Sequence, residues 1–176
     1  MTQRATIFSA CRQFRYVLRR EWNSSSSKYV MFIGLNPSTA DETNNDPTIR
    51  RCIAFARTWG YGALCVTNLF AYRATKLNKL KTQSMPVGAE NDAWLFRVAQ
   101  FAHLIVAVWG VNGTYQGRNQ QVLQLLSQTI MCLRETRNGQ PWHPLYFRRS
   151  ATPQLSRAGR IYGGLPILTT PQNRIE

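Results

Sequence analysis

Asparagine and histidine side chains occur in this sequence at the ends of apolar stretches, where they could do chemistry. Asn36 follows a stretch that ends at Gly34, Asn68 lies near the end of a second stretch, and His143 follows Trp142 further along the chain. An asparagine amide offers both a donor and an acceptor, and a neutral histidine also offers one of each. These side chains could therefore bind a ligand through directed hydrogen bonds.

The elements that must position these side chains are buried strands that alternate with helices. Four apolar stretches predict strands, at 28–34, 63–70, 103–108 and 129–133. Asp46-Pro47 predicts the start of a helix, with Asp as the cap and Pro in the first turn, and two more helices are expected over 89–101 and 118–128. Strands that alternate with helices imply a mostly parallel sheet, whose carboxyl ends carry the binding site.

The chain is long enough for one domain, which we expect to span residues 1–176. Its predicted class is α/β, a three-layer domain with a central, mostly parallel, four-stranded sheet. Residues 11–22 alternate apolar and basic side chains, which predicts a half-exposed strand. That strand, the serine-rich turn and the next strand are expected to form an N-terminal β-hairpin over 7–33, and residues 150–176 a C-terminal extension.

Basic residues greatly outnumber acidic ones, with 22 Lys and Arg against 8 Asp and Glu and a formal net charge of +14. A basic surface gains affinity for nucleic acid because phosphates release counterions when they are neutralised. The charge is spread over a folded chain, and its clusters are Arg50-Arg51, Lys76–Lys81 (expected to be a loop), Arg148-Arg149 and Arg157–Arg160. We therefore expect a nucleic acid as the partner.

Several classes of protein are excluded by what the sequence lacks. No apolar run approaches the roughly 18 residues of a membrane span. The first 20 residues carry arginine within their apolar stretches, unlike a secretory signal, so a cytoplasmic protein without a membrane partner is expected. Cys11, Cys52, Cys65 and Cys132 form no C-x-x-C pair, so we expect no metal and no cofactor. Residues 163–176 carry no dimer signal, and we expect a monomer.

Four motifs resemble, in their order along the chain, those of the uracil-DNA glycosylase superfamily. Gly34–Ser38 (GLNPS) resembles the first active-site motif of its mismatch-specific branch, G-I/L-N-P-G. The stretch Leu64–Phe70 is similar to the strand whose asparagine reads the flipped pyrimidine. Val106–Gly110 resembles a later strand that ends in Trp-Gly, and His143–Tyr146 resembles the second catalytic motif, H-P-S-P-L.

A wider set of strings resembles a bacterial and phage domain family of unknown function. These strings are LNPSTAD, DPTIRRC, WGY, NLFAYRAT and HPLY. This second resemblance covers most of the chain, from Phe8 to about Phe147.

The glycosylase resemblance implies a monofunctional DNA N-glycosylase, a hydrolase that flips a base out of the DNA stack into a pocket. It implies that Asn36 positions a water below the sugar carbon and that Asn68 reads the Watson–Crick edge of the base. His143 would donate a hydrogen bond to the base carbonyl, where negative charge develops as the bond breaks. Phe70 or Tyr72 would stack on the base, worth about 1–3 kcal/mol.

Basic side chains would then hold the DNA backbone beside the flipped nucleotide. Arg148 and Arg149 come just after His143 and are expected to grip its phosphates. The other arginines expected to bind DNA are Arg50, Arg51 and Arg73.

Two departures from the superfamily pattern change the expected substrate. Uracil-specific enzymes carry an acid in the first motif and a Tyr beside carbon 5 of the base, where this chain has Asn36 and Ser38. Without the acid, water activation is expected to be weak unless Asp41 or Asp46 acts as the base. Without the bulky ring, carbon 5 has room for a substituent. We therefore hypothesise a modified or damaged pyrimidine, such as a hypermodified phage base, and both DNA repair and antiviral defence fit.

Structural readings of the same residues stay open from the sequence alone. Asn-Pro is a common turn dipeptide, Asn68 could tie two loops together, His143 could be a loop residue, and Asp46 a helix cap. Leu145-Tyr146 also stands where the second motif usually has Ser-Pro. Two other functions therefore stand beside the DNA glycosylase: an enzyme of modified nucleotide or base metabolism, and a non-catalytic nucleic-acid-binding module.

Overall fold

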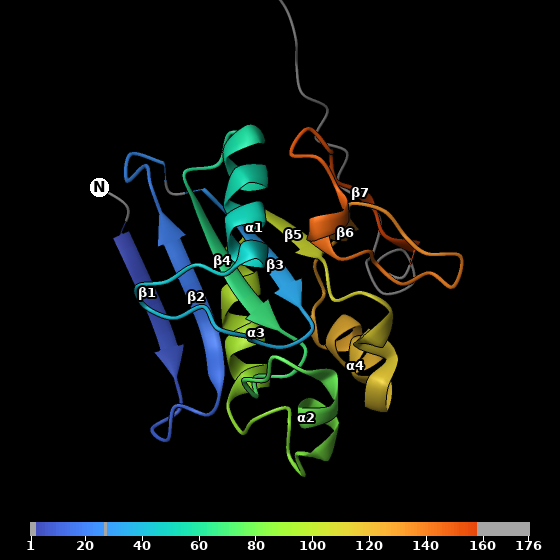
Figure 1. Cartoon of the computed structure of the whole chain (residues 1–176). Coiled ribbons are helices and arrows are strands. Elements are labelled where there is room, and N and C mark those ends of the chain that lie inside the picture. Colours follow the sequence, from blue (N-terminus) through green and yellow to red (C-terminus); the bar gives the residue numbers. More distant parts are fainter. Residues whose placement is uncertain (1–2, 27, 158–176) are drawn as a thin grey trace, which may run out of the picture.

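The computed structural model describes residues 3–26 and 28–157, and within them seven strands form one mixed sheet (Figure 1). The strands are β1 (Gln3–Phe8), β2 (Arg15–Glu21), β3 (Tyr29–Gly34), β4 (Ala63–Asn68), β5 (Leu104–Ala107), β6 (Ile130–Cys132) and β7 (Gln154–Leu155). Their order in the sheet is β1-β2-β4-β3-β5-β6-β7. Most of the expected C-terminal extension, 150–176, and the basic residue Arg160 lie outside the described residues.

The four central strands β4, β3, β5 and β6 are mutually parallel, which confirms the mostly parallel core of an α/β fold. The expected sheet of four strands is too small, however. β1 and β2 extend it antiparallel on one side, through the pairing of β2 with β4, and β7 pairs antiparallel with β6 on the other. β7 has only two residues, too few for an alternating pattern to predict a strand.

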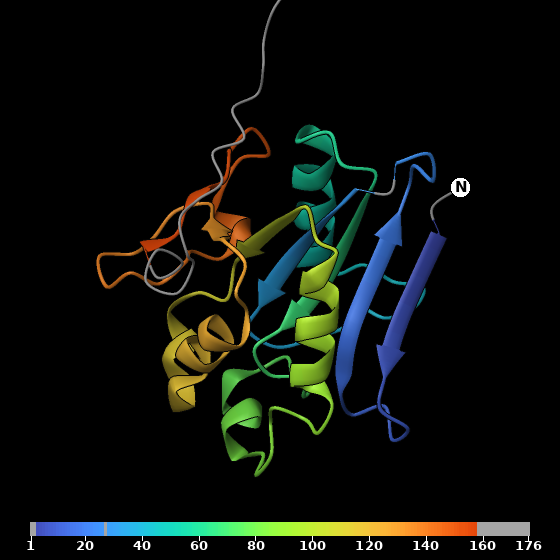
Figure 2. The same cartoon turned by 180° about the vertical axis from the view of Figure 1, so that it is seen from behind.

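Helices cover both faces of this sheet. The α-helices are α1 (Pro47–Thr58), α2 (Leu77–Thr82), α3 (Asn91–Gln100) and α4 (Arg118–Leu125), and the 3-10 helices are η1 (Val111–Gly117) and η2 (Pro144–Tyr146). α1 lies on one face of β3 and β4, and α3 lies on the opposite face (Figures 1 and 2). No helix in the described part is long and apolar enough to cross a membrane.

β3 is the buried strand that its apolar run predicts. Val30 and Phe32 pack with the side chains of α1, and Met31 and Ile33 pack with those of α3. A strand with parallel neighbours on both sides and a helix over each face must be apolar at every position. The continuous apolar run of β3 therefore follows from the central place of this strand in the sheet.

The N-terminal hairpin is formed by different strands from those expected over 7–33. β1 and β2 pair with each other, with Gln3 opposite Glu21, and β2 does not pair with β3. β4 lies between β2 and β3, parallel to β3 and antiparallel to β2. The serine-rich turn therefore leads across β4, and the hairpin prediction was wrong because a later strand occupies the place beside β3.

β2 is also more buried than the half-exposed strand that its alternation predicts. Its residues Arg15 to Leu18 are all buried, and Arg20 is fully enclosed. The long loop between β3 and α1 crosses β2 (Figure 1), and the guanidiniums of Arg15 and Arg20 donate to backbone carbonyls of that loop. Arginine in an alternating strand predicts a solvent-exposed side chain, but here it holds a loop against the sheet.

The helix start at Asp46-Pro47 is confirmed. The Asp46 carboxylate accepts a hydrogen bond from the backbone N–H of Ile49 at 2.8 Å, and Pro47 is the first helical residue. The basic segment Lys76–Lys81, expected to be a loop, instead forms most of the short helix α2. Leu77 and Leu80 supply an apolar face that packs against the core.

Candidate functional site

A pocket of about 450 Å³ lies at the carboxyl ends of the central strands. The chain leaves β3 through α1 to reach β4 on one side of β3, and it leaves β5 through α4 to reach β6 on the opposite side. The chain connections therefore diverge between β3 and β5, which is the point where α/β sheets open a crevice. Leu35 and Asn36, which follow β3, and Trp109 and Gly110, which follow β5, line the pocket.

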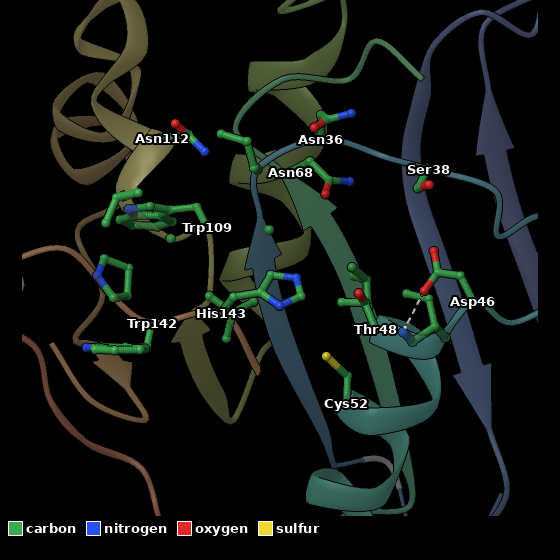
Figure 3. A pocket seen from close by; sticks show the side chains of 18 of the residues that line it. Asn36, Ser38, Asp46, Thr48, Cys52, Asn68, Trp109, Asn112, Trp142 and His143 are labelled. Carbon is green, nitrogen blue, oxygen red and sulfur yellow. Dashed lines mark hydrogen bonds between the residues drawn. The ribbon is translucent and has the colours of Figure 1, made fainter. Parts of the chain in front are cut away.

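The pocket brings together side chains that lie far apart in the sequence. Asn36, Asn68 and His143 all line it, as do Ser38 and Asp46. Figure 3 shows the amides of Asn36 and Asn68 and the imidazole of His143 around one space. The polar residues picked out at the strand ends in the sequence therefore meet in a single cavity.

The Asn36 amide is held by the backbone. Its Nδ2 donates to the carbonyl of Ala74 at 2.7 Å and to that of Pro37 at 2.9 Å. Both amide hydrogens are therefore used, which leaves Oδ1 as the atom that can accept a hydrogen bond from a ligand or a water.

The Asn68 side chain makes no hydrogen bond within the described residues, although it is only 3% exposed. Its Nδ2 is buried without a partner, and an unpaired buried amide costs about 1–3 kcal/mol. The Nδ2 of Asn91 behaves differently, because it donates to the carbonyls of Asn68 and Leu69, each at 3.0 Å, although Asn91 Oδ1 is buried without a partner. The Asn68 side chain therefore does not tie loops together, and it lines the pocket.

Gly34 makes room for the Asn68 amide. The two residues are register partners in β3 and β4, and a Cβ at position 34 would lie 2.8 Å from Asn68 Oδ1. Carbon and oxygen atoms do not pack that closely, so any larger residue would displace the amide. The glycine of the GLNPS motif is thus required by the side chain across the sheet.

His143 is half-buried, and its ring is directed into the pocket (Figure 3). Its Nδ1 accepts a hydrogen bond from the backbone N–H of Leu145 at 3.4 Å, which leaves the proton on Nε2. Burial lowers the pKa of His143, and the negative charge of Asp46 opposes that shift. The ring is therefore a neutral hydrogen-bond donor at pH 7.

The two candidate bases have different surroundings. Asp46 lines the pocket, and one of its oxygens caps α1. Asp41 does not line the pocket, and its carboxylate accepts hydrogen bonds from the backbone N–H groups of Thr43 and Asn44. These bonds hold the pKa of Asp41 well below its usual range. In residues 3–26 and 28–157, no group of His, Cys, Asp and Glu side chains is placed to hold a metal ion.

The expected stacking residues do not reach the pocket. Phe70 is fully buried and packs against Tyr115 in the core, and Tyr72 packs edge-on against Phe14. The chain turns after Asn68, so both rings are directed away from the carboxyl ends of the strands, where the pocket lies. The aromatic side chains that do line the pocket are Trp109, Trp142 and Tyr146.

The arginines expected to bind DNA are divided by the fold. Arg50 and Arg51 directly follow Thr48 and Ile49, which line the pocket, and Arg148 and Arg149 closely follow Tyr146, which also lines it. η2, which precedes the second pair, contacts α1. Arg73 lies elsewhere, over the ring of Phe8 in the N-terminal hairpin.

Two residues of the site were missed because their sequence context gave the opposite signal. Trp109 ends an apolar stretch, which is typical of a core residue, and it is only 4% exposed, yet it also forms a wall of the pocket. Arg15 lies in a strand read as half-exposed, yet it is buried and lines the pocket. A buried arginine in β2, between β1 and β4, leaves no mark in the sequence beyond its alternation.

Comparisons with known proteins give one family. Residues 15–145, which include β2 to β6 and the whole pocket apart from Tyr146, match the family described as "Protein of unknown function (DUF1643)". No curated protein and no solved structure matches the chain. Nothing in these comparisons relates it to the uracil-DNA glycosylase superfamily, so that resemblance stays an inference from the four motifs. Since the match covers most of the chain, this protein belongs to the DUF1643 family.

Proposed function

We propose that this protein is a DNA N-glycosylase that excises a modified pyrimidine from DNA. The observation that carries the proposal is the meeting of Asn36, Asn68 and His143 in one pocket, although they come from three separate segments. A pocket of about 450 Å³ lies within the range of small-ligand sites and has room for a pyrimidine nucleoside.

Each of the three side chains suits one step of base excision. Asn68 has a buried amide without a partner, and the Watson–Crick edge of a flipped base offers the complementary groups. The Nε2–H of neutral His143 would donate to a base oxygen, which takes up negative charge as the bond between N1 and the sugar breaks. Asn36 Oδ1 would accept a hydrogen bond from the water that forms the new bond to the sugar carbon.

The proton of that water needs an acceptor, and Asp46 is the carboxylate among the pocket-lining residues. One of its oxygens caps α1, which leaves the other for the water. The bond between the water oxygen and the sugar carbon forms, the glycosidic bond breaks, and its electron pair leaves with the base. Asp46 takes over the role that the sequence left open between Asp41 and Asp46.

The shape of the pocket supports a substituted base over plain uracil. Ser38 lines the pocket at the position where the resemblance implies a bulky ring beside carbon 5. Trp109 and Trp142 lie on the side of the pocket opposite Asp46 and Thr48 (Figure 3) and supply flat surfaces for a base or a sugar substituent. The pocket is also set in a fold with a parallel core, which is compatible with the glycosylase resemblance.

The charge of the chain supports DNA as the carrier of that base. The net charge is +14, and the arginine pairs 50-51 and 148-149 each lie within a few residues of the pocket lining. Free nucleotides need no wide basic surface, which speaks for a polymer over the alternative of nucleotide metabolism.

The test is excision from defined DNA. Duplexes that contain uracil, a thymine mismatch, hydroxymethylcytosine or glucosylated hydroxymethylcytosine are incubated with the protein and assayed for alkali-labile abasic sites. We expect abasic sites with a base substituted at carbon 5, and their loss in Asn36→Ala. Asn78→Ala is the control, since Asn78 is an exposed amide on α2 outside the pocket.

Other results would direct the function elsewhere. Tight, salt-dependent binding without abasic sites on any substrate would indicate a non-catalytic nucleic-acid-binding module. Neither binding nor cleavage would indicate chemistry on free nucleotides or bases. Release of uracil alone would contradict the proposed substituent.

A further inference from the structure

Arg15 is the least expected residue of the pocket. It lies on β2, is 2% exposed, and lines the cavity together with Ser38 and Asp46. Burial lowers the pKa of its guanidinium to about 10, so the side chain is still charged at neutral pH. A buried charge is normally paired, because removal from water costs several kcal/mol unless another group compensates it.

The hydrogen bonds of Arg15 do not compensate that charge. Its Nη1 donates to the carbonyl of Ala40 at 2.9 Å. Its Nε is buried without a partner, and no hydrogen bond joins Nη2 to any described residue. Nε and Nη2 form one edge of the planar guanidinium, the edge that binds a phosphate or carboxylate through two parallel hydrogen bonds.

Arg20, five residues further along β2, shows how this protein satisfies a purely structural arginine. All three of its nitrogens donate: Nε to Asn45 Oδ1 at 2.9 Å, Nη1 to the carbonyl of Arg19 at 2.9 Å, and Nη2 to the carbonyl of Asp41. Arg20 does not line the pocket. Both arginines hold the loop between β3 and α1, but only Arg15 has donors to spare.

Asp46 does not pair with Arg15 either. It is the carboxylate among the residues that line the pocket, and its negative charge opposes the lowering of the Arg15 pKa by burial. No ion pair joins the two side chains. The ion pairs of the described residues involve other arginines: Arg12, Arg19, Arg118 and Arg157.

We infer that Arg15 binds an anionic group of the substrate, a phosphate or a carboxylate, through its Nε and Nη2. Ser38 lies in the loop segment that Arg15 holds, lines the pocket, and its hydroxyl makes no hydrogen bond within the described residues. It is therefore a second donor for the same group. The inference rests on the proposed function in taking the ligand to be a pyrimidine nucleotide.

The anion can come from two parts of such a ligand. It can be the phosphate next to the flipped nucleotide, or an acidic substituent on carbon 5 of the base, since Ser38 stands where the resemblance places that carbon. Both present oxygens that a guanidinium edge recognises, and a set of small ligands separates them.

The experiment follows the Nε–H resonance of Arg15 by NMR in the wild-type protein. The resonance is identified by its absence in Arg15→Lys. The protein is titrated with thymidine, thymidine 5′-monophosphate, thymidine 3′-monophosphate and 5-carboxy-2′-deoxyuridine. We expect at least one anionic ligand to shift the resonance while neutral thymidine does not, and the ligand that does so names the source of the anion. The Nε–H resonance of Arg20 is the internal control and should not move.

The same titrations give affinities. The effective anionic ligand should bind about tenfold more tightly than thymidine, as expected for a hydrogen-bonded charge pair, and Arg15→Gln should abolish this preference. An Arg15 resonance that moves equally with thymidine, or with none of the four ligands, would overturn the inference. The titration itself is observed in the wild-type protein, and the assignment holds when Arg15→Lys retains the other native resonances, including the Nε–H of Arg20.

Failure of this inference and failure of the proposed function give different results. Anion-selective shifts without abasic sites on any DNA would retain the Arg15 site and reject the glycosylase. Abasic sites with an unresponsive Arg15 would retain the glycosylase and reject the anion site.

Discussion

Asn68→Ala is the substitution that best separates a ligand-binding amide from a structural one. The Asn68 side chain is buried and makes no hydrogen bond within the described residues. Its removal abolishes an unpaired donor that costs about 1–3 kcal/mol, and this gain offsets the packing lost with a small side chain at the wall of an open pocket. We therefore expect the free energy of unfolding to change by less than about 1 kcal/mol.

Asn91→Ala is the matched control. Asn91 is equally enclosed and its Oδ1 is also buried without a partner, but its Nδ2, unlike that of Asn68, donates to the carbonyls of Asn68 and Leu69. Two hydrogen bonds of about 0.5–1.5 kcal/mol each are lost, and the carbonyl of Asn68 loses its side-chain donor. Asn91→Ala should therefore destabilise the protein by about 1–3 kcal/mol, which corresponds to a fall in Tm of roughly 2–12 °C for a chain of this size.

The two variants are compared by urea unfolding and by excision of the base that the abasic-site assay identifies. Asn68→Ala should keep its stability and lose at least about tenfold in kcat/KM, because the base loses its hydrogen-bond partners. If Asn68→Ala were destabilised as much as Asn91→Ala, the amide would have a structural role in the free protein. The reasoning from the unpaired Nδ2 would then be refuted.

Four further predictions address the rest of the site. Gly34→Ala places a Cβ 2.8 Å from Asn68 Oδ1, so the displaced amide should lower kcat/KM by about 10²-fold, and an unchanged rate would show that the amide can shift harmlessly. Asp46→Asn keeps the helix cap, since both residues cap well, so the free energy of unfolding should change by less than about 0.5 kcal/mol. The rate of excision should fall about 10²- to 10⁴-fold. Full activity would show that Asp46 serves only as the helix cap. Because the folded-state pKa of His143 is lowered by burial, the unfolded chain binds a proton first, so stability should be complete above pH 6.5 or so and fall as the pH drops below it. Urea unfolding as a function of pH should show this loss, and His143→Gln should reduce it; equal curves would show that the ring is freely protonated. Arg148→Ala should reduce the salt slope of DNA binding by about one unit, whereas an unaltered slope would exclude a phosphate contact.

The sequence predicted the parallel core of the fold because that core depends on local signals. A continuous apolar run such as Tyr29–Ile33 can be stable only between two neighbours and two helix layers, and the structure places it there. Asp46-Pro47 carries the chemistry of a helix start, and the structure has the helix begin there. The edges of the sheet were predicted poorly, because strands that are distant in sequence compete for the same neighbour. β4 takes the place beside β3 that the hairpin prediction gave to β2.

The polar part of the pocket was also accessible from the sequence. Asn36 and Asn68 follow or end apolar strands, and parallel strands bring their carboxyl ends to one edge, so the two amides had to lie near each other. Phe70 and Tyr72 were assigned to the pocket from their place in a motif, but side chains after a strand end follow the path of the turn. That path directs both rings into the core.

What the sequence alone determined is therefore the set of residues that can do chemistry and the strands that carry them, because composition and local spacing encode both. Only the tertiary structure decided which of them share a cavity, which amide is unpaired, and which arginine faces inward. Those properties depend on contacts between segments far apart in the chain. Arg15 and Arg20 occupy the same strand and carry the same charge, and they differ only in what the folded chain places beside them.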